Sequence, residues 1–139
     1  MTDSAMIYDV MDLDGSLGFV RAAGLVVDEV GPTAVRGHID LTEDHHTPWG
    51  IVHGGVYATA VESAASIGGT IAVREQGMVA VGLTNTTQFL RSLTGGRVEV
   101  SAVALHQGRT QQLWKVDVTD DRDRIIAHGE LRLQNVQAG

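Results

Sequence analysis

The stretch His53-Gly54-Gly55-Val56-Tyr57-Ala58-Thr59-Ala60-Val61-Glu62 predicts the element around which this chain folds. Its two adjacent glycines mark the start of a helix that runs from about Gly54 to Arg74 and consists mainly of small apolar residues. A helix of this composition is expected to be buried, with a sheet or another helix pressed against its backbone. Glu62 is therefore a carboxylate in a costly position, which makes it a candidate for function.

Strand-like segments lie on both sides of this helix. Residues 25–30 and the alternating segment 35–42 predict a hairpin, and a polar loop over residues 43–52 leads into the helix. Four further strands are predicted after the helix, at residues 78–89, 97–106, 111–119 and 124–136. We expect these four to form an antiparallel meander. The predicted class is α+β, with a twisted antiparallel sheet wrapped around one long central helix.

Length and composition limit the possible functions. The 139 residues suit a single domain, with residues 1–23 as a helical lead-in. The formal net charge of −7 opposes docking on nucleic acid or on an anionic membrane. The chain has no cysteine, which excludes disulfides, thiolate metal sites and cysteine nucleophiles. No apolar run approaches the roughly 18 residues of a membrane span. Acidic residues near the N-terminus do not suit a signal peptide, so we expect a cytoplasmic protein.

The glycine pair and Glu62 together predict chemistry on a carbonyl group. Backbone N–H groups at the pair can approach a ligand closely, and the helix N-terminus adds partial positive charge, so a substrate carbonyl could be polarised there. Ser66 follows Glu62 by four residues and shares its helix face. The carboxylate could deprotonate a water held by Ser66, or attack the carbonyl and form a mixed anhydride. The structural alternative is a Glu62 paired with a buried arginine and a Ser66 bonded to its own helix.

Histidines cluster just before the helix, but they do not predict a metal centre. His45, His46 and His53 lack the spacing of any standard zinc motif, so no metal is expected. His53 is expected instead to orient the glycine turn through a hydrogen bond. A serine-based triad is also not expected, because the chain contains no Gly-x-Ser-x-Gly elbow.

Three arginines are notable in so acidic a chain. Arg91, Arg97 and Arg109 fall in or beside the predicted strands, where together they could form a local anion site. The simpler interpretation of each one is a solvated surface residue.

These residues resemble a known family. The segment Thr47-Pro48-Trp49-Gly50-Ile51-Val52-His53-Gly54-Gly55, followed by Glu62-Ser63 and Ser66, resembles the hotdog-fold acyl-CoA thioesterases of the 4-hydroxybenzoyl-CoA and phenylacetate-pathway type. Two more segments, Val81 to Ser92 and Leu105 to Trp114, are most similar to the branch that holds 1,4-dihydroxy-2-naphthoyl-CoA thioesterase and the proofreading thioesterase of enterobactin synthesis. The resemblance covers residues from about 25 to 136.

The resemblance implies a role for each matching residue. It places the catalytic carboxylate on Glu62, the oxyanion amide on Gly54, with His53 before it, and the water-holding hydroxyl on Ser66. Thr47 stands where relatives have a glutamine or asparagine that polarises the thioester carbonyl. The implied contacts with substrate and CoA fall on Gly55, Gly82, Phe89, Leu90, Arg91, Ser92, His106, Gln107, Gly108 and Arg109. Arg91 and Arg109 would meet phosphates, and Phe89 replaces a histidine of the most similar branch.

The implied activity is hydrolysis of an aromatic or medium-length acyl-CoA to a free acid and CoA. No metal or organic cofactor is expected, and the implied assembly is a homodimer or a homotetramer, with sites at the subunit boundary. One alternative is a non-catalytic acyl-CoA sensor, which would use the same binding segments but not Glu62. Another is a hotdog dehydratase acting on β-hydroxyacyl thioesters, which needs a histidine opposite the carboxylate.

Overall fold

The computed structural model describes residues 18–139. The predicted helical lead-in therefore lies largely outside the described residues, and its last part forms helix α2 (Gly18–Ala23). The other elements in chain order are β1 (Val26–Val30), β2 (Ala34–Leu41), the 3-10 turn η1 (Glu43–His45), α3 (Gly54–Val73), the 3-10 turn η2 (Arg74–Gln76), β3 (Met78–Phe89), β4 (Gly96–Gln107), β5 (Gln111–Thr119) and β6 (Ile125–Gln137).

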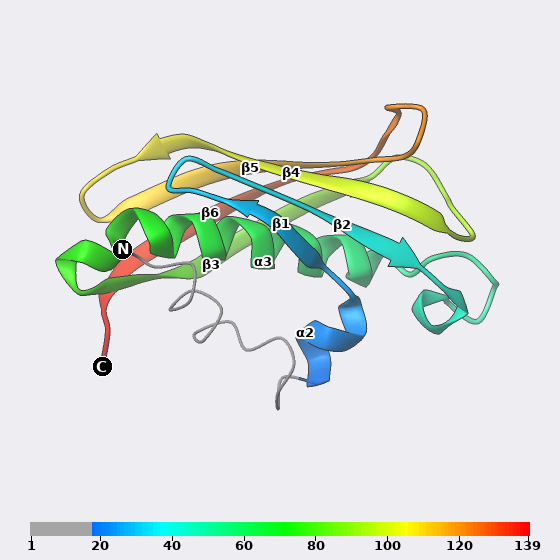
Figure 1. Cartoon of the computed structure of the whole chain (residues 1–139), viewed down its shortest axis with the longest axis horizontal. Coiled ribbons are helices and arrows are strands. Elements are labelled where there is room, and N and C mark those ends of the chain that lie inside the picture. The colour runs from blue at the N-terminus through cyan, green and yellow to red at the C-terminus, as the bar shows by residue number, and fades with distance from the viewer. Residues whose placement is uncertain (1–17) are drawn as a thin grey trace.

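The six strands form one antiparallel sheet in the order β1-β2-β4-β5-β6-β3. Figure 1 shows this sheet curving over α3, which runs along its concave side. The predicted alternation holds in β2, where Val35, Gly37, Ile39 and Leu41 are buried and their neighbours face outward. The prediction of a hotdog fold, a sheet wrapped around one long helix, is confirmed.

The predicted meander is wrong for one of its four strands. β4, β5 and β6 are neighbours in sequence order, but β3 pairs with β6 and not with β4. The alternation of apolar residues indicates which face of a strand is buried, but it does not indicate the neighbour with which the strand pairs. As a result β3 is an edge strand, and among residues 18–139 its outer edge has no pairing partner.

Close packing joins α3 to the sheet. The small residues of the helix include Gly68, whose Cα lies directly against the indole ring of Trp114 on β5. A Cβ atom at residue 68 would overlap that ring. Trp114 is completely buried and is the largest side chain of the core. The prediction that small residues allow a sheet to approach the helix backbone is confirmed at this contact.

Helix α3 with the turn η2 is long and apolar enough to be a candidate membrane span, although no apolar run of that length was expected from the sequence. By length and composition alone, Gly54–Gln76 could cross a membrane, with a mean hydropathy of 1.2. The core helix of a folded domain meets the same criteria, and α3 contacts strands β2 to β6 along its length. Contact with the sheet accounts for part of the hydropathy of α3, since 39% of its apolar window is buried within the chain.

We predict that Gly68→Ala destabilises the protein by about 1–3 kcal/mol, because an added methyl group must displace the Trp114 ring in a close-packed core. Chemical denaturation would measure the change in the free energy of unfolding. Gly18→Ala is the control, since a Cβ there meets no atom within 4 Å. Equal stability of the two variants would contradict the importance of the Gly68 contact.

Candidate active site

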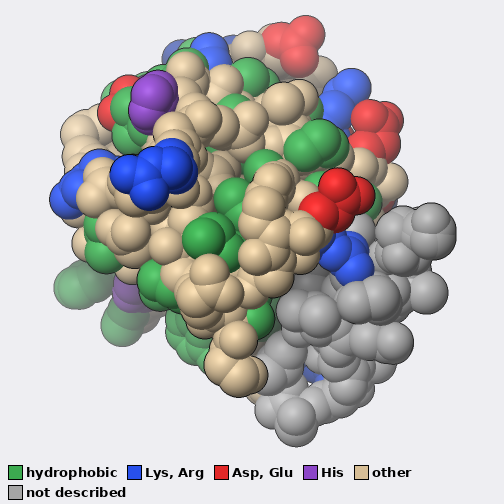
Figure 2. All heavy atoms as spheres, turned by 90° about the vertical axis from the view of Figure 1, so that its left-hand side faces the viewer, with side chains coloured by type: hydrophobic (Ala, Val, Ile, Leu, Met, Phe, Trp, Pro, Cys, Tyr) green, Lys and Arg blue, Asp and Glu red, His purple; other side chains and the backbone are tan. Residues whose placement is uncertain are grey.

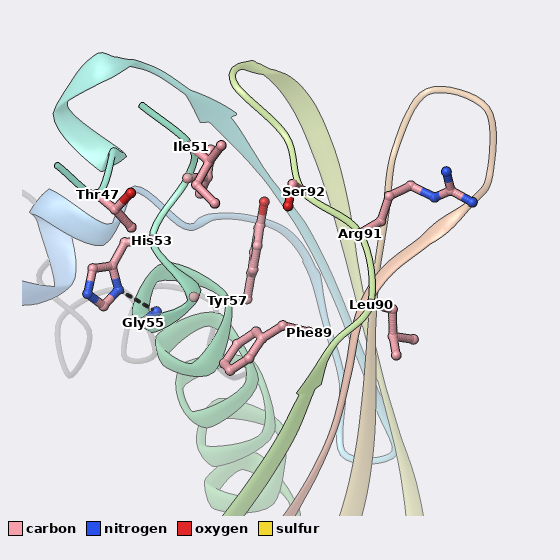
Figure 3. A pocket seen from close by; sticks show the side chains of 11 residues that line it. Thr47, Ile51, His53, Gly55, Tyr57, Phe89, Leu90, Arg91 and Ser92 are labelled. Carbon is pink, nitrogen blue, oxygen red and sulfur yellow. Dashed lines mark hydrogen bonds between the residues drawn. The ribbon is translucent and has the colours of Figure 1, made fainter. Parts of the chain in front are cut away.

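A pocket of about 440 Å³ lies at the N-terminal end of α3. Figure 3 shows its walls, which come from the loop before α3, the first turn of α3 and the end of β3 with the residues that follow it. The pocket brings together eight of the residues implied by the resemblance: Thr47, His53, Gly54, Gly55, Phe89, Leu90, Arg91 and Ser92. In Figure 3 the Arg91 side chain points away from the other labelled residues.

The glycine turn presents one free backbone donor to this pocket. His53 caps α3, and its Nδ1 accepts a hydrogen bond of 2.8 Å from the Gly55 amide. This is the orienting contact predicted for His53. The N–H of Gly54 has no hydrogen-bond partner among residues 18–139, as expected for the first amide of a helix. Only one of the two glycine amides is therefore free to bind an anion or a carbonyl oxygen.

Phe89 packs against the Cα of Gly54. A Cβ at Gly54 would come within 2.9 Å of the Phe89 ring, so the ring packs against the glycine. Thr47 lines the same pocket, and its hydroxyl accepts a hydrogen bond of 3.2 Å from the Trp49 amide. The two residues that depart from the family pattern thus belong to the same pocket. The Phe89 ring gives this pocket an apolar wall.

Tyr57 also lines the pocket and was not predicted from the sequence. Its ring is 3% exposed and stands between Ile51 and Ser92 in Figure 3. Its hydroxyl group is buried and has no hydrogen-bond partner among residues 18–139. Burial raises the pKa of Tyr57 to about 12, so the phenol stays protonated at neutral pH.

Glu62 lies on the side of α3 that faces the edge strand β3. It is exposed in the single chain, so the expectation of a carboxylate deep among small residues is wrong for an isolated subunit. The ion pairs found between residues 18–139 do not include Glu62, which rules out the buried arginine partner considered as an alternative. Instead, its Oε1 accepts a hydrogen bond of 3.2 Å from Asn85, and its Oε2 lies against the Cα of Gly82.

The two groups implied for carbonyl chemistry do not meet within one chain. Gly54 and Glu62 are eight residues apart on α3, which corresponds to about 12 Å along the helix axis. For general-base catalysis, the carboxylate must lie within about 3 Å of the water that attacks a carbonyl bound at the Gly54 amide. Glu62 of the same chain is too far from Gly54 for this. Ser66 is half-buried one turn beyond Glu62 on the same face, as the spacing predicted.

The remaining predicted contacts lie at the other end of α3. The end of β4 carries His106 and Gln107, and the turn before β5 carries Gly108 and Arg109. The last three of these four residues line a second pocket of about 340 Å³. Because α3 is about 30 Å long, Arg91 and Arg109 are separated by most of the molecule. Figure 2 shows this end of the protein, where several Lys or Arg side chains are at the surface.

A buried polar network explains the shape of that turn. Gln112 accepts hydrogen bonds from Trp114 at 2.9 Å and from Gln107 at 3.1 Å, and it donates to the Gly69 carbonyl and to Asn135. Asn135 in turn donates to the backbone carbonyls of residues 108 and 109, each at 3.2 Å. The side-chain amide of Gln107 is therefore hydrogen-bonded within the chain, and the backbone that carries Arg109 is held by Asn135.

The expected cluster of three arginines is not formed. Arg97 makes two hydrogen bonds to Asp40, of 2.9 and 3.2 Å, across β4 and β2. The side-chain hydrogen bond from Arg97 lowers the pKa of Asp40, and the same bond raises the pKa of Arg97. Arg97 therefore has a partner within the protein, and Arg91 and Arg109 lie at opposite ends of α3. The three arginines do not form one anion site.

The histidines before α3 hold backbone segments together. Nδ1 of His45 accepts from the Thr42 amide at 3.0 Å, and its Nε2 lies 3.0 Å from the Ala22 carbonyl. Nε2 of His46 lies 2.7 Å from the Thr94 carbonyl. Residues 18–139 contain no group of three or more His, Cys, Asp or Glu side chains that could hold a metal ion.

Comparison with known proteins decides the family. The family model described as "Thioesterase superfamily" matches residues 50–127, which is more than half of the chain. The chain belongs to the thioesterase superfamily. A thioesterase from Haemophilus influenzae has the same fold, with a TM-score of 0.85 at 22% identity over 99% of this chain and 93% of that one.

Relatives differ in how closely they match this superfamily member. The Mycobacterium tuberculosis protein named "Putative esterase Rv1847" is 41% identical, with 91% of each chain covered, and its solved structure superposes with a TM-score of 0.84 over 88% of this chain and 99% of that one. The 1,4-dihydroxy-2-naphthoyl-CoA hydrolase of Listeria monocytogenes is 30% identical over 79% of this chain and 89% of that protein. The predicted superfamily is confirmed, whereas the identities do not favour the naphthoyl-CoA branch over the mycobacterial relative.

Two residues of this superfamily member's site escaped the sequence analysis. Asn85 could have been noticed, because asparagine is uncommon inside strands and here follows a strongly β-forming segment. Tyr57 gave no such signal, since an aromatic residue near a helix start is usually part of the core. Only the structure shows that its hydroxyl group lacks a partner.

We predict that Tyr57→Phe increases the free energy of unfolding by about 1–3 kcal/mol at neutral pH, because it removes a buried hydroxyl without a hydrogen bond. The raised pKa adds a pH dependence. Above its ordinary pKa near 10 the Tyr57 phenol ionises in the unfolded chain but stays protonated in the folded chain, so the wild type loses stability as the pH rises towards about 12. Denaturation between pH 7 and 11 should show a smaller alkaline loss for Tyr57→Phe than for the wild type. A variant less stable than the wild type would show that the hydroxyl has a partner in solution.

Proposed function

We propose that this protein is an acyl-CoA thioesterase, which hydrolyses the thioester to a free carboxylic acid and CoA. The observation that carries the proposal is Glu62. It is a carboxylate without an ionic partner among residues 18–139, on a helix of small apolar residues, held in place by a neutral amide. Superfamily membership and the names of the relatives support thioester hydrolysis as the activity of the protein.

The proposed chemistry uses one donor and one carboxylate. The Gly54 amide and the helix dipole stabilise the oxyanion that forms as the carbonyl carbon becomes tetrahedral. In the general-base route Glu62 takes a proton from a water that Ser66 helps to hold, and the resulting hydroxide adds to the carbonyl carbon. The C–S bond then breaks, and the CoA thiolate receives a proton. In the alternative route Glu62 adds to the carbonyl itself, the C–S bond breaks as the CoA thiolate leaves and takes up a proton, and water then hydrolyses the resulting mixed anhydride.

We further propose that each active site is shared by two copies of the chain. The separation of about 12 Å between Gly54 and Glu62 on one helix supports this, because no single thioester can contact both. The open edge of β3 supports it as well, since an unpaired edge strand is a ready site for pairing with another chain. Pairing there would cover Glu62, which is exposed in the single chain. A homodimer is the smallest assembly that satisfies these conditions, and a homotetramer would contain two of them.

The proposed substrates are aromatic or medium-length acyl-CoA thioesters. The apolar walls formed by Ile51 and Phe89 beside the free Gly54 amide suit an acyl group without charge. In this proposal the CoA phosphates are bound by arginine. Because Arg91 and Arg109 are at opposite ends of α3, one CoA molecule would meet both only if two chains contribute them.

We predict that Glu62→Gln lowers kcat for hydrolysis of benzoyl-CoA by about 10²- to 10⁴-fold, the scale of general-base catalysis. The substitution keeps the shape of the side chain and removes its charge and basicity. Release of free thiol over time measures the rate. Glu75→Gln, in the exposed turn η2 beyond the other end of the helix, is the matched control and should retain wild-type kcat. A Glu62→Gln enzyme with more than about a third of wild-type kcat would refute the catalytic role.

We predict that two inactive variants, Gly54→Val and Glu62→Gln, regain activity when they are refolded together. In a mixed dimer one shared site collects both lesions and the other collects none. Random pairing under two-fold symmetry then restores about a quarter of wild-type activity. Native mass spectrometry would verify that heterodimers are present. If such a mixture stayed inactive, both groups would have to come from the same chain.

A further inference from the structure

We propose that Asn85 is a positioning residue, which fixes the carboxylate of Glu62 through Oε1 and leaves Oε2 as the oxygen that reacts. The inference rests on the proposed function of Glu62 and adds to it the atom that acts and the group that holds it. It is carried by the hydrogen bonds of Asn85 and by the shape of β3 at this point.

The hydrogen bonds of Asn85 allow only one orientation of its amide. Its Nδ2 donates to the Ala58 carbonyl at 3.0 Å and to Oε1 of Glu62 at 3.2 Å. Both partners are acceptors only, so the nitrogen and not the oxygen of the amide must face them. On the other side, Oδ1 accepts a hydrogen bond of 2.7 Å from the Thr87 hydroxyl. A rotated amide would lose the two bonds to Ala58 and Glu62 and bring its oxygen against two other oxygens.

The second carboxylate oxygen of Glu62, Oε2, occupies the space that a side chain at residue 82 would fill. Oε2 of Glu62 lies against the Cα of Gly82, where any Cβ atom would overlap it. It forms no hydrogen bond with residues 18–139. Oε1 is thus held by Asn85, while Oε2 keeps both lone pairs available for a proton or a carbonyl carbon.

A β-bulge places these two residues on the same side of the strand. Residues 82 and 85 are three apart, so in a regular strand their side chains would face opposite sides of the sheet. The register of β3 against β6 shifts between Gly82 and Thr84, which inserts Leu83 as an extra residue. Both Gly82 and Asn85 therefore face α3 at Glu62. Bulges commonly direct a side chain into a site in this way.

The neutral character of Asn85 is part of its role. A carboxylate beside a cation is a weaker base, and a carboxylate beside a second carboxylate is hard to ionise. The groups that contact Glu62 from β3 are Gly82 and the Asn85 amide, and its neighbours one turn away on α3 are Ala58 and Ser66. None of these four groups titrates. An amide therefore orients the carboxylate without changing its charge.

The test is a ¹³C NMR titration of the Glu62 carboxyl carbon, which is assigned by its absence in Glu62→Gln. Asn85→Asp places a carboxylate next to Oε1, and we expect the Glu62 midpoint to rise by about one pH unit or more. The acidic limb of the kcat/KM profile for benzoyl-CoA should move in the same direction. Gln88→Glu is the matched control, because it makes the same change of amide to acid at an exposed residue of β3. In Gln88→Glu the titration midpoint of Glu62 should stay within about a third of a pH unit of the wild-type midpoint.

Gly82→Ala tests the position of Oε2 independently. Only the end of the Glu62 side chain has to move to admit the new methyl group, so the fold should be kept. We expect kcat to fall by about 10- to 100-fold with KM changed less than about twofold, because a displacement near 1 Å is costly for a catalytic group.

An unchanged Glu62 titration in folded Asn85→Asp, or full activity of Gly82→Ala, would overturn the inference. The proposed function has a separate test, because an active Glu62→Gln enzyme would refute catalysis by Glu62 even if Asn85→Asp shifts the titration. Conversely, an inactive Glu62→Gln enzyme with no shift in Asn85→Asp would leave the function intact and refute the role of Asn85.

Discussion

The close approach of α3 to the sheet is the constraint on which the rest of the structure depends. Gly68 rests on the Trp114 ring, and the small residues around it let the sheet curve over the helix with little space between them. This contact sets the depth and direction of the helix. Its first turn is thereby held at the pocket that contains Gly54, and its flank is held beside β3, where Glu62 meets Asn85. A bulkier helix would move both groups away from the strand that completes their surroundings.

The same straight helix keeps Gly54 and Glu62, the two groups proposed to react, apart. An amide at the helix start and a carboxylate two turns later cannot converge on one carbonyl carbon, whatever the sheet does around them. Two copies related by a two-fold axis resolve this conflict without any bending of the helix, since the flank of one helix can be placed beside the start of the other. The exposed Glu62 and the unpaired edge of β3 are on the same side of the chain, so one pairing event would supply both the second helix and the shelter that the carboxylate lacks.

Local contacts then adapt a common superfamily plan to this chain. Phe89 packs against Gly54 and Tyr57 brings a neutral hydroxyl group to the same pocket, so the pocket combines apolar walls with one buried hydroxyl. Around the site, polar side chains mostly serve structure. His45 and His46 tie loops to backbone carbonyls, Arg97 is paired with Asp40, and Gln112 supports the turn that carries Arg109. Among residues 18–139, the Gly54 amide, the Tyr57 hydroxyl and Oε2 of Glu62 have no hydrogen-bond partner.

The sequence by itself determined the elements, because each depends on local patterns. The alternation in residues 35–42 identified a half-buried strand, and the glycine pair identified the start of α3. The motif from Thr47 to Gly55 with Glu62 identified the superfamily. Only the tertiary structure decided which strand lies next to which, so it alone showed that β3 is at an edge and that Glu62 is exposed. It also separated Arg91 from Arg109 and brought Asn85 to Glu62 through a bulge of one residue. Contacts between segments distant in sequence leave no periodic signal along the chain, which is the physical reason why these features could not be predicted.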